Sequence, residues 1–344
     1  MATTNTDHTD LNAALKGGVV REDVMDKIWD ISRIPLPFTD MCSTGTHTNQ
    51  FVEYTTDDLG DAATDNAVVD GADITQNDAA LGLRVGNYTQ TAVKAVQIST
   101  RANASNSIGR MGSLSYQVAQ AQRRLRRDVE AQMLTHQASV AGDGNTVAGI
   151  SAGLGSWLVT NTSFGIGGSA GGFNTTTGLI DAPTPGTART LTETLIRDIA
   201  EAVYVAGGET MYIMGRPVVI RALSEYLFSS SARIATMTND NASGTSPMTA
   251  YGSANTFITD FGQVLKLIPN RLQPQDDTDT STLYFLDPKH LKQSFMRGYR
   301  TEPLAKTGLS EKRMISVDYS LCVLNEKSQG MICAIDETAA VTAP

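Results

Sequence analysis

Residues able to do chemistry are few in this sequence, and they stand far apart. The four histidines have neither the HExxH spacing of a metalloprotease nor a neighbouring cysteine that would complete a zinc site: His8, His47, His136 and His290. The stretch GIGGSA at 165–170 has the glycine spacing of a dinucleotide-binding loop, but the sequence after it cannot open the helix that such a loop requires. No nucleophile elbow and no Walker loop occurs. We therefore expect no catalytic residue, cofactor or metal site, and a protein that is not an enzyme.

Arginine is the one chemical group that clusters. Four arginines lie within the sequence QRRLRR: Arg123, Arg124, Arg126 and Arg127. At 100° per residue on a helix they fan over about 160°, opposite a stripe that includes Leu114 and Leu125. Such a face can bind DNA phosphates, an acidic protein surface or only water. Phosphate-binding proteins combine a basic domain with interleaved aromatic residues, whereas this chain has a formal net charge of −9. We therefore favour a protein partner, with a cytosolic nucleic-acid-binding protein as the alternative.

Charge is segregated on either side of this cluster. Between Ile34 and Leu83 the chain has nine acids and no Lys or Arg, and between Ala79 and Arg127 it has eight bases and no acid. Segregation of this kind is what the docking of one charged surface on another requires. The simpler interpretation is that the charges only keep a solvent-exposed surface hydrated. We predict inter-subunit contacts between the arginines and three acids of a second copy: Asp57, Asp58 and Asp61.

The elements that must carry these charges follow from the residue pattern. We predict strands at 48–59, 84–101 and 312–325, helices at 21–32 and 113–137, and a small-polar loop at 229–250. The helix at 113–137 is about 37 Å long at 1.5 Å per residue. From residue 190 onward helices and strands alternate. The first two strands form a long arm around a polar loop, and because a lone two-stranded hairpin is only marginally stable in water, another molecule is expected to steady it.

Composition supports a folded chain whose surface is largely covered by partners. Charged residues make up 18% of the 344 residues, below the roughly 25% of ordinary soluble domains. No stretch approaches the ~20 apolar residues of a membrane span, and the first residues lack a signal sequence's apolar core. Three cysteines without CxxC spacing predict reduced, buried thiols. We expect a protein that is kept in the cytosol and has no membrane partner.

The order of elements resembles the major capsid protein of tailed bacteriophages, which has the Hong Kong 97-type fold. Local likeness lies in WDISRIPLPFTDM at 29–41, in the helix at 113–137 and in the closing segment at 302–335. The resemblance implies an α+β fold in five parts: an N-terminal arm (1–47), an E-loop hairpin (48–104), a long spine helix with the first part of the peripheral domain (105–189), an axial domain (190–275), and return strands of the peripheral domain (276–344).

The same resemblance implies a structural function. A protein of this family is expected to self-assemble through pentamers and hexamers into an icosahedral shell that encloses double-stranded phage DNA. Its implied partners are copies of itself, scaffold, portal and decoration proteins, and DNA at the inner wall. We expect it in the virion capsid after assembly in the host cytoplasm. An encapsulin-like compartment shell shares the fold and is an alternative from the same resemblance.

Overall fold

The structure is a computed structural model that describes residues 35–57, 82–105, 112–229 and 256–341, with positions 62, 64–65, 67–71 and 73 between them. The helix predicted at 21–32 lies outside the described residues, as does the loop predicted at 229–250 apart from Ser229. The short helices of the described residues are α2 (Pro37–Met41), α3 (Thr100–Ala104) and α5 (Leu154–Trp157). The longer helices are α4 (Leu114–Met133), α6 (Glu193–Val205) and α7 (Pro217–Ser229).

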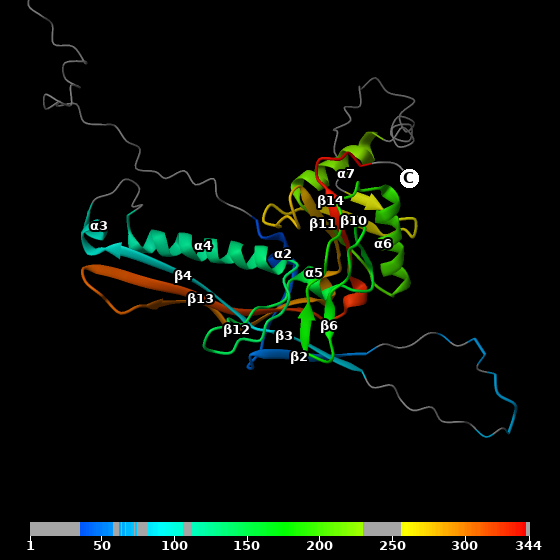
Figure 1. The fold of residues 1–344 in the computed structure, drawn as a ribbon, viewed down its shortest axis with the longest axis horizontal. Helices are drawn as coiled ribbons and strands as arrows, with labels where there is room; N and C mark the ends of the chain where they lie inside the picture. Colours follow the sequence, from blue (N-terminus) through cyan, green and yellow to red (C-terminus); the bar gives the residue numbers. More distant parts are fainter. Residues whose placement is uncertain are drawn as a thin grey trace, which may run out of the picture.

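A four-stranded sheet forms the elongated half of the described molecule, with α4 lying along it (Figure 1). Its strands, in spatial order, are β1 (Ser43–Thr46), β12 (Leu291–Pro303), β13 (Ser310–Val323) and β4 (Gln90–Ser99). The predicted alternation of β13 is confirmed, because Ile315, Val317 and Tyr319 are buried in the core that α4 covers. The polar side chains between them, Ser316 and Asp318, are also buried. Both faces of β13 are therefore covered over residues 315–319.

A six-stranded sheet forms the other half, and α6 and α7 cover one of its faces. Its strands, in spatial order, are β5 (Thr162–Ser163), β14 (Gly330–Asp336), β11 (Thr280–Leu286), β8 (Tyr212–Gly215), β10 (Val264–Pro269) and β9 (Thr256–Ile258). The helices contribute Ile196 and Leu223 to a core shared with Phe285 of β11. On the opposite face Tyr284 joins the core of α4 and donates a hydrogen bond to the Leu134 carbonyl at 3.2 Å. The two halves therefore share packed side chains.

Two hairpins extend from these sheets. The first pairs β2 (Phe51–Thr56) with β3 (Leu83–Tyr88), and the second pairs β6 (Gly172–Asn174) with β7 (Leu179–Asp181). In Figure 1, α2 and α4 lie along the upper edge of the elongated half and β2–β3 lies along its lower edge, with the four-stranded sheet between them. The arm predicted from the strand pattern is therefore present, and it projects on the side away from α4.

Four predicted boundaries differ from the elements in the structure. The strand expected at 84–101 is two strands, because the pairing changes partner at Thr89, whose N–H donates to the Gln50 carbonyl at 2.8 Å. The strand β3 belongs to the hairpin and β4 to the four-stranded sheet, so the hairpin ends at Tyr88 and not at residue 104. The division predicted at residue 275 does not separate two cores, because β11 and β14 pair within the sheet that holds β8 and β10. The long helix ends at Met133, where Leu134 N–H bonds back to the Ala131 carbonyl at 3.2 Å instead of continuing to residue 137.

Candidate subunit interface

The long helix α4 presents one buried face and one charged face. Ser113 caps its N-terminus by accepting the Tyr116 N–H at 3.3 Å. Its buried apolar residues recur at steps of four: Ala121, Leu125, Val129 and Met133. This spacing places them on a single stripe toward β4 and β13, which leaves the remaining face to the arginines.

The arginine face is exposed, as predicted, with one exception. Arg123, Arg124 and Arg126 are exposed, whereas Arg127 is only partly exposed. Its Nε atom is buried and has no hydrogen-bond partner among the described residues. The Arg126 guanidinium lies 5.2 Å from the ring centroid of Tyr299, a cation–π contact worth about 0.5–1 kcal/mol at an exposed site. The helix therefore carries a strongly basic surface that its own sheet covers only in part.

Some of the segregated charge is used within the chain. Lys94 of β4 forms an ion pair with Asp128 of α4 at 2.6 Å, and Arg84 pairs with Glu53 across the β2–β3 hairpin. Exposed pairs of this kind contribute about 0–1 kcal/mol each. The first pair connects β4 to α4, and the second connects β2 to β3. Neither pair includes any of the four clustered arginines.

The three predicted acidic contacts divide between described and undescribed parts of the chain. Asp57 directly follows β2, on the side of the molecule away from α4. Asp58 and Asp61 lie outside the described residues. The fold separates β2 from α4 by a sheet within one copy (Figure 1), so the strand that Asp57 follows does not lie against the arginine face of its own chain.

The root of the hairpin is held by buried polar contacts that the sequence pattern did not reveal. Asn87 is fully buried, donates to the Leu321 carbonyl at 2.7 Å and accepts from the Ala152 N–H at 3.0 Å. Tyr54 donates to the Val323 carbonyl at 2.7 Å, and burial raises the pKa of its hydroxyl. Because all of these groups are satisfied, the hairpin leaves the sheet in one fixed direction.

Glu130 is a second residue that sequence reasoning missed. Its carboxylate is fully buried on α4 and accepts from the Phe38 N–H at 2.9 Å, from the Thr39 N–H at 2.7 Å and from the Asn270 amide at 2.8 Å. The hydroxyl of Thr39 also donates to it, at 2.5 Å. An acid three residues before the buried Met133 was the only signal in the sequence. Glu130 thereby joins α2, where the N-terminal arm enters the fold, to α4 and to the end of β10.

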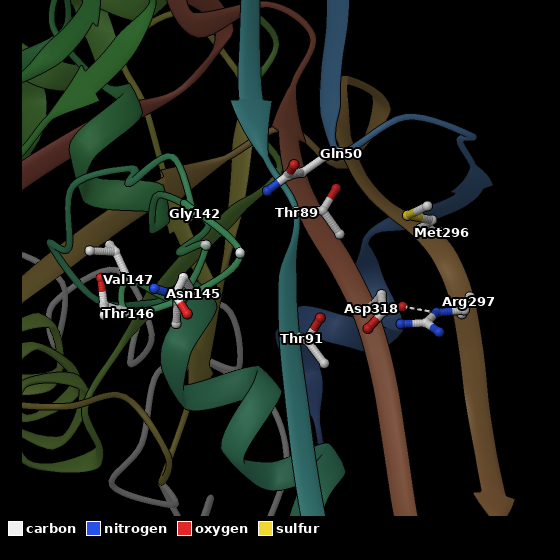
Figure 2. A pocket seen from close by; sticks show the side chains of 13 residues that line it. Gln50, Thr89, Thr91, Gly142, Asn145, Thr146, Val147, Met296, Arg297 and Asp318 are labelled. Carbon is white, nitrogen blue, oxygen red and sulfur yellow. Dashed lines mark hydrogen bonds and ion pairs between the residues drawn. The ribbon is translucent and has the colours of Figure 1, made fainter.

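A pocket of about 570 Å³, lined by both polar and apolar groups, lies on the face of the four-stranded sheet beside the hairpin root (Figure 2). Thr89, between β3 and β4, and Thr91 of β4 line one side, and Asp318 of β13 and Arg297 of β12 line it from the next two strands. The two charged groups form an ion pair with each other, and the Asp318 carboxylate is buried. Because these charges neutralise one another, the pocket offers hydrogen-bonding groups with little net charge.

A rigid loop at 142–149 closes one side of this pocket (Figure 2). The Asp143 carboxylate accepts hydrogen bonds from the Thr146 hydroxyl at 2.6 Å and from the backbone N–H groups of Asn145, Thr146 and Val147 at 2.7–2.8 Å. These bonds hold the pKa of the Asp143 carboxyl well below its usual range. The hydrogen bond from the Thr146 hydroxyl has the largest effect, and the backbone N–H groups add to it. One of the loop's own side chains therefore holds its backbone in place.

The histidines and cysteines do not converge on a reactive centre. Among the described residues no group of three His, Cys, Asp or Glu side chains could hold a metal ion. His136 bonds to Asp276 at 2.9 Å and to Thr282 at 3.0 Å, which is a structural contact between the end of α4 and β11. The three cysteines are free and buried, as predicted, and burial raises the pKa of Cys322 to about 11. In the part of the chain that the structure describes, no helix is long and apolar enough to cross a membrane.

Solved structures of low sequence identity share this fold. The capsid of a native GTA particle, computed with C5 symmetry, is 11% identical, with a TM-score of 0.58 over 96% of this chain and 99% of its own. A structure from Mycobacterium phage Bobi is 10% identical, with a TM-score of 0.59 over 95% and 99%. The encapsulin complex from Synechococcus elongatus is 12% identical, with a TM-score of 0.56 over 96% and 98%. The fold is therefore the Hong Kong 97-type capsid fold, as the sequence resemblance implied.

Sequence comparison gives the family. The major capsid protein of Escherichia phage Phieco32 is 26% identical, with 86% of this chain and 89% of that protein covered. The family model described as SU10 major capsid protein matches residues 2–336. Since that match spans almost the whole chain, this protein belongs to the SU10 family of phage major capsid proteins.

Proposed function

We propose that this capsid protein assembles through pentamers and hexamers into an icosahedral shell around double-stranded DNA, held in part by charge. The acidic hairpin loop of one copy, with Asp57, Asp58 and Asp61, docks on the arginine face of the next. The observation that carries this proposal is the placement of exposed arginines on α4 and of the acidic hairpin on the opposite edge of the molecule. In a closed ring of identical copies, opposite edges of neighbours meet.

The expected strength of this contact follows from its exposure. Three screened ion pairs at about 0.2–1 kcal/mol each contribute roughly 0.6–3 kcal/mol per interface. Since about 1.4 kcal/mol is a factor of ten in affinity, losing them raises the protein concentration needed for assembly by about 3- to 140-fold. Salt weakens the contact because the charges lie near solvent.

Charge reversal tests this pairing. Changing the four arginines to glutamate should impair assembly, and adding lysine at positions 57, 58 and 61 should restore it. The matched control changes the same arginines to lysine, which keeps the charge and should leave assembly nearly intact. Normal particles from the glutamate variant would refute the pairing without refuting shell formation.

Further partners belong to the same proposal. Scaffold, portal and decoration proteins would meet the shell during assembly in the host cytoplasm, and its role would be structural and not enzymatic. An encapsulin-like shell is a second candidate, because a solved encapsulin complex shares the fold over 96% of this chain. Purified particles that contain protein cargo and no nuclease-protected DNA would decide for it. Steep salt-dependent binding of DNA by the unassembled chain would favour the nucleic-acid-binding alternative.

A further inference from the structure

The chain has two Asp-Gly pairs, a dipeptide that can rearrange without an enzyme. Asp70–Gly71 lies between β2 and β3, in the acidic hairpin loop, and Asp143–Gly144 lies in the loop at 142–149 beside the pocket of Figure 2. Glycine permits the rearrangement because it has no side chain to hinder its nitrogen as that atom approaches the preceding carboxyl carbon. The surroundings of each aspartate therefore decide whether its pair reacts.

The two glycines are closely matched. Gly71 has a φ of +79° and Gly144 a φ of +73°, a left-handed backbone that glycine adopts without strain. A Cβ built on either glycine would meet no atom of the described residues within 4 Å. The backbone therefore does not distinguish the two pairs, and a difference between them must come from the aspartate side chains.

The Asp143 carboxylate is held by both of its oxygens. One oxygen accepts the N–H groups of Asn145, Thr146 and Val147 at 2.7–2.8 Å, and the other accepts the Thr146 hydroxyl at 2.6 Å. These bonds must break before the carboxyl can turn to present its carbon to the Gly144 nitrogen. They also keep the carboxyl ionised, because they lower its pKa, and an ionised carboxyl has no hydroxyl group to lose.

Asp70 lies in a different setting. Asp70 and Gly71 form an exposed turn, and Val68 and Val69 before it are 65% and 80% exposed. Among the residues that the structure describes, none forms a hydrogen bond or an ion pair with the Asp70 carboxylate. A side chain that is exposed and held by no such bond moves among several rotamers. The Asp70 carboxyl is therefore free to turn toward the Gly71 nitrogen.

We propose that Asp70–Gly71 isomerises spontaneously to isoaspartate and that the fold protects Asp143–Gly144 from the same reaction. The Gly71 nitrogen attacks the carbon of the neutral Asp70 carboxyl. A C–N bond forms, the C–OH bond breaks, and the hydroxyl leaves as water with the amide proton, which gives a cyclic imide. Water then attacks the backbone carbonyl carbon of Asp70 and breaks its bond to nitrogen, so the chain runs through the side-chain carbon. Attack at the other carbonyl restores aspartate.

The product differs from the original turn in shape and not in charge. One water leaves and one returns, so the mass is unchanged, and the released backbone carboxyl replaces the charge of the side chain. The backbone of the turn becomes longer by one methylene group. As the protein ages, the hairpin loop therefore changes its path, whereas the loop at 142–149 keeps the structure with which it folded.

Peptide mapping of the full-length chain, aged in mildly acidic solution, tests the proposal. Isoaspartate is detected by an isoaspartyl methyltransferase and located by electron-transfer fragmentation. It should accumulate at position 70 about ten-fold or more faster than at position 143, since each unit by which a pKa is lowered reduces the neutral fraction ten-fold. In urea the two positions should react at similar rates, because unfolding removes the bonds around Asp143. Equal rates in the folded chain, or isoaspartate at position 70 only after unfolding, would overturn the proposal.

Two variants identify the cause of the difference. Thr146→Val removes the hydroxyl donor and should raise isoaspartate at position 143 several-fold without changing position 70. Asp70→Glu keeps the exposed charge, but its longer side chain would have to close a larger ring, so isoaspartate at position 70 should disappear while position 143 behaves as in the original chain. No effect of Thr146→Val at position 143 would contradict protection by these bonds. If that variant does not fold, the urea comparison still decides, and none of these results depends on shell assembly.

Discussion

Replacing Glu130 should destabilise the fold more than any ordinary loss of a charged residue. Its carboxylate is fully buried and receives hydrogen bonds from Phe38, Thr39 and Asn270, of which the Phe38 N–H and the Asn270 amide are themselves buried. A buried donor left without a partner costs about 1–3 kcal/mol. Glu130→Ala orphans these two donors and removes the bonds to Thr39, so we expect a loss of about 3–5 kcal/mol.

Glu130→Gln separates the charge from the hydrogen bonds. The amide keeps one acceptor oxygen for Phe38 and Asn270, while its NH₂ group faces Thr39 and cannot accept the Thr39 N–H. The Thr39 hydroxyl can turn to accept from the new NH₂ group, so the loss should be smaller, about 1–2 kcal/mol.

Urea unfolding of the unassembled chain, followed by tryptophan fluorescence, measures both losses. The matched control is Glu201→Gln, on the exposed side of α6, which should change the free energy of unfolding by less than about 0.5 kcal/mol. If Glu130→Ala were as mild as that control, the buried carboxylate would not be the link between α2, α4 and β10.

Three further predictions concern the loop, the thiols and a tight glycine. The Asp143 contribution to loop order should be complete above about pH 4, where the unfolded carboxyl is also ionised, and should be lost as pH falls through its lowered folded pKa. Protection of the 145–147 amides, relative to the intrinsic exchange rate at each pH, that does not fall in acid or in Asp143→Ala would contradict this. Iodoacetamide at pH 8 should leave Cys322 and Cys333 unlabelled in the native chain and label both in urea, since burial raises their pKa values to about 11 and about 12; rapid native labelling would be the opposing result. Gly155→Ala should cost about 1–3 kcal/mol, because the new Cβ would overlap the imidazole at position 136, whereas Gly298→Ala meets no atom within 4 Å and should be nearly neutral by thermal unfolding; equal melting temperatures would argue against close packing there.

Features with a local period could be predicted from the sequence. The stripe through Leu125 and Val129 recurs at helical spacing, and the alternation of Ile315, Val317 and Tyr319 marks a strand in a single stretch of chain. The exposure of Arg123 followed directly from the opposite face of that stripe. Such patterns depend on neighbours a few residues away, so one sequence is enough to read them.

Features that depend on distant partners could not be predicted. Glu130 meets Phe38 and Asn270, which lie 92 and 140 residues away. Asn87 bonds to Leu321, 234 residues away. The placement of β11 and β14 beside β8 is likewise set by long-range packing, so strands on both sides of residue 275 share one sheet. In each case the sequence contains the polar or apolar residue but no signal for its partner.

Electron microscopy of the purified protein tests the central claim most directly. The account predicts uniform closed shells with fivefold and sixfold clusters of subunits on their surface. Monodisperse single chains under every salt, pH and protein concentration tried would contradict a self-assembling capsid protein.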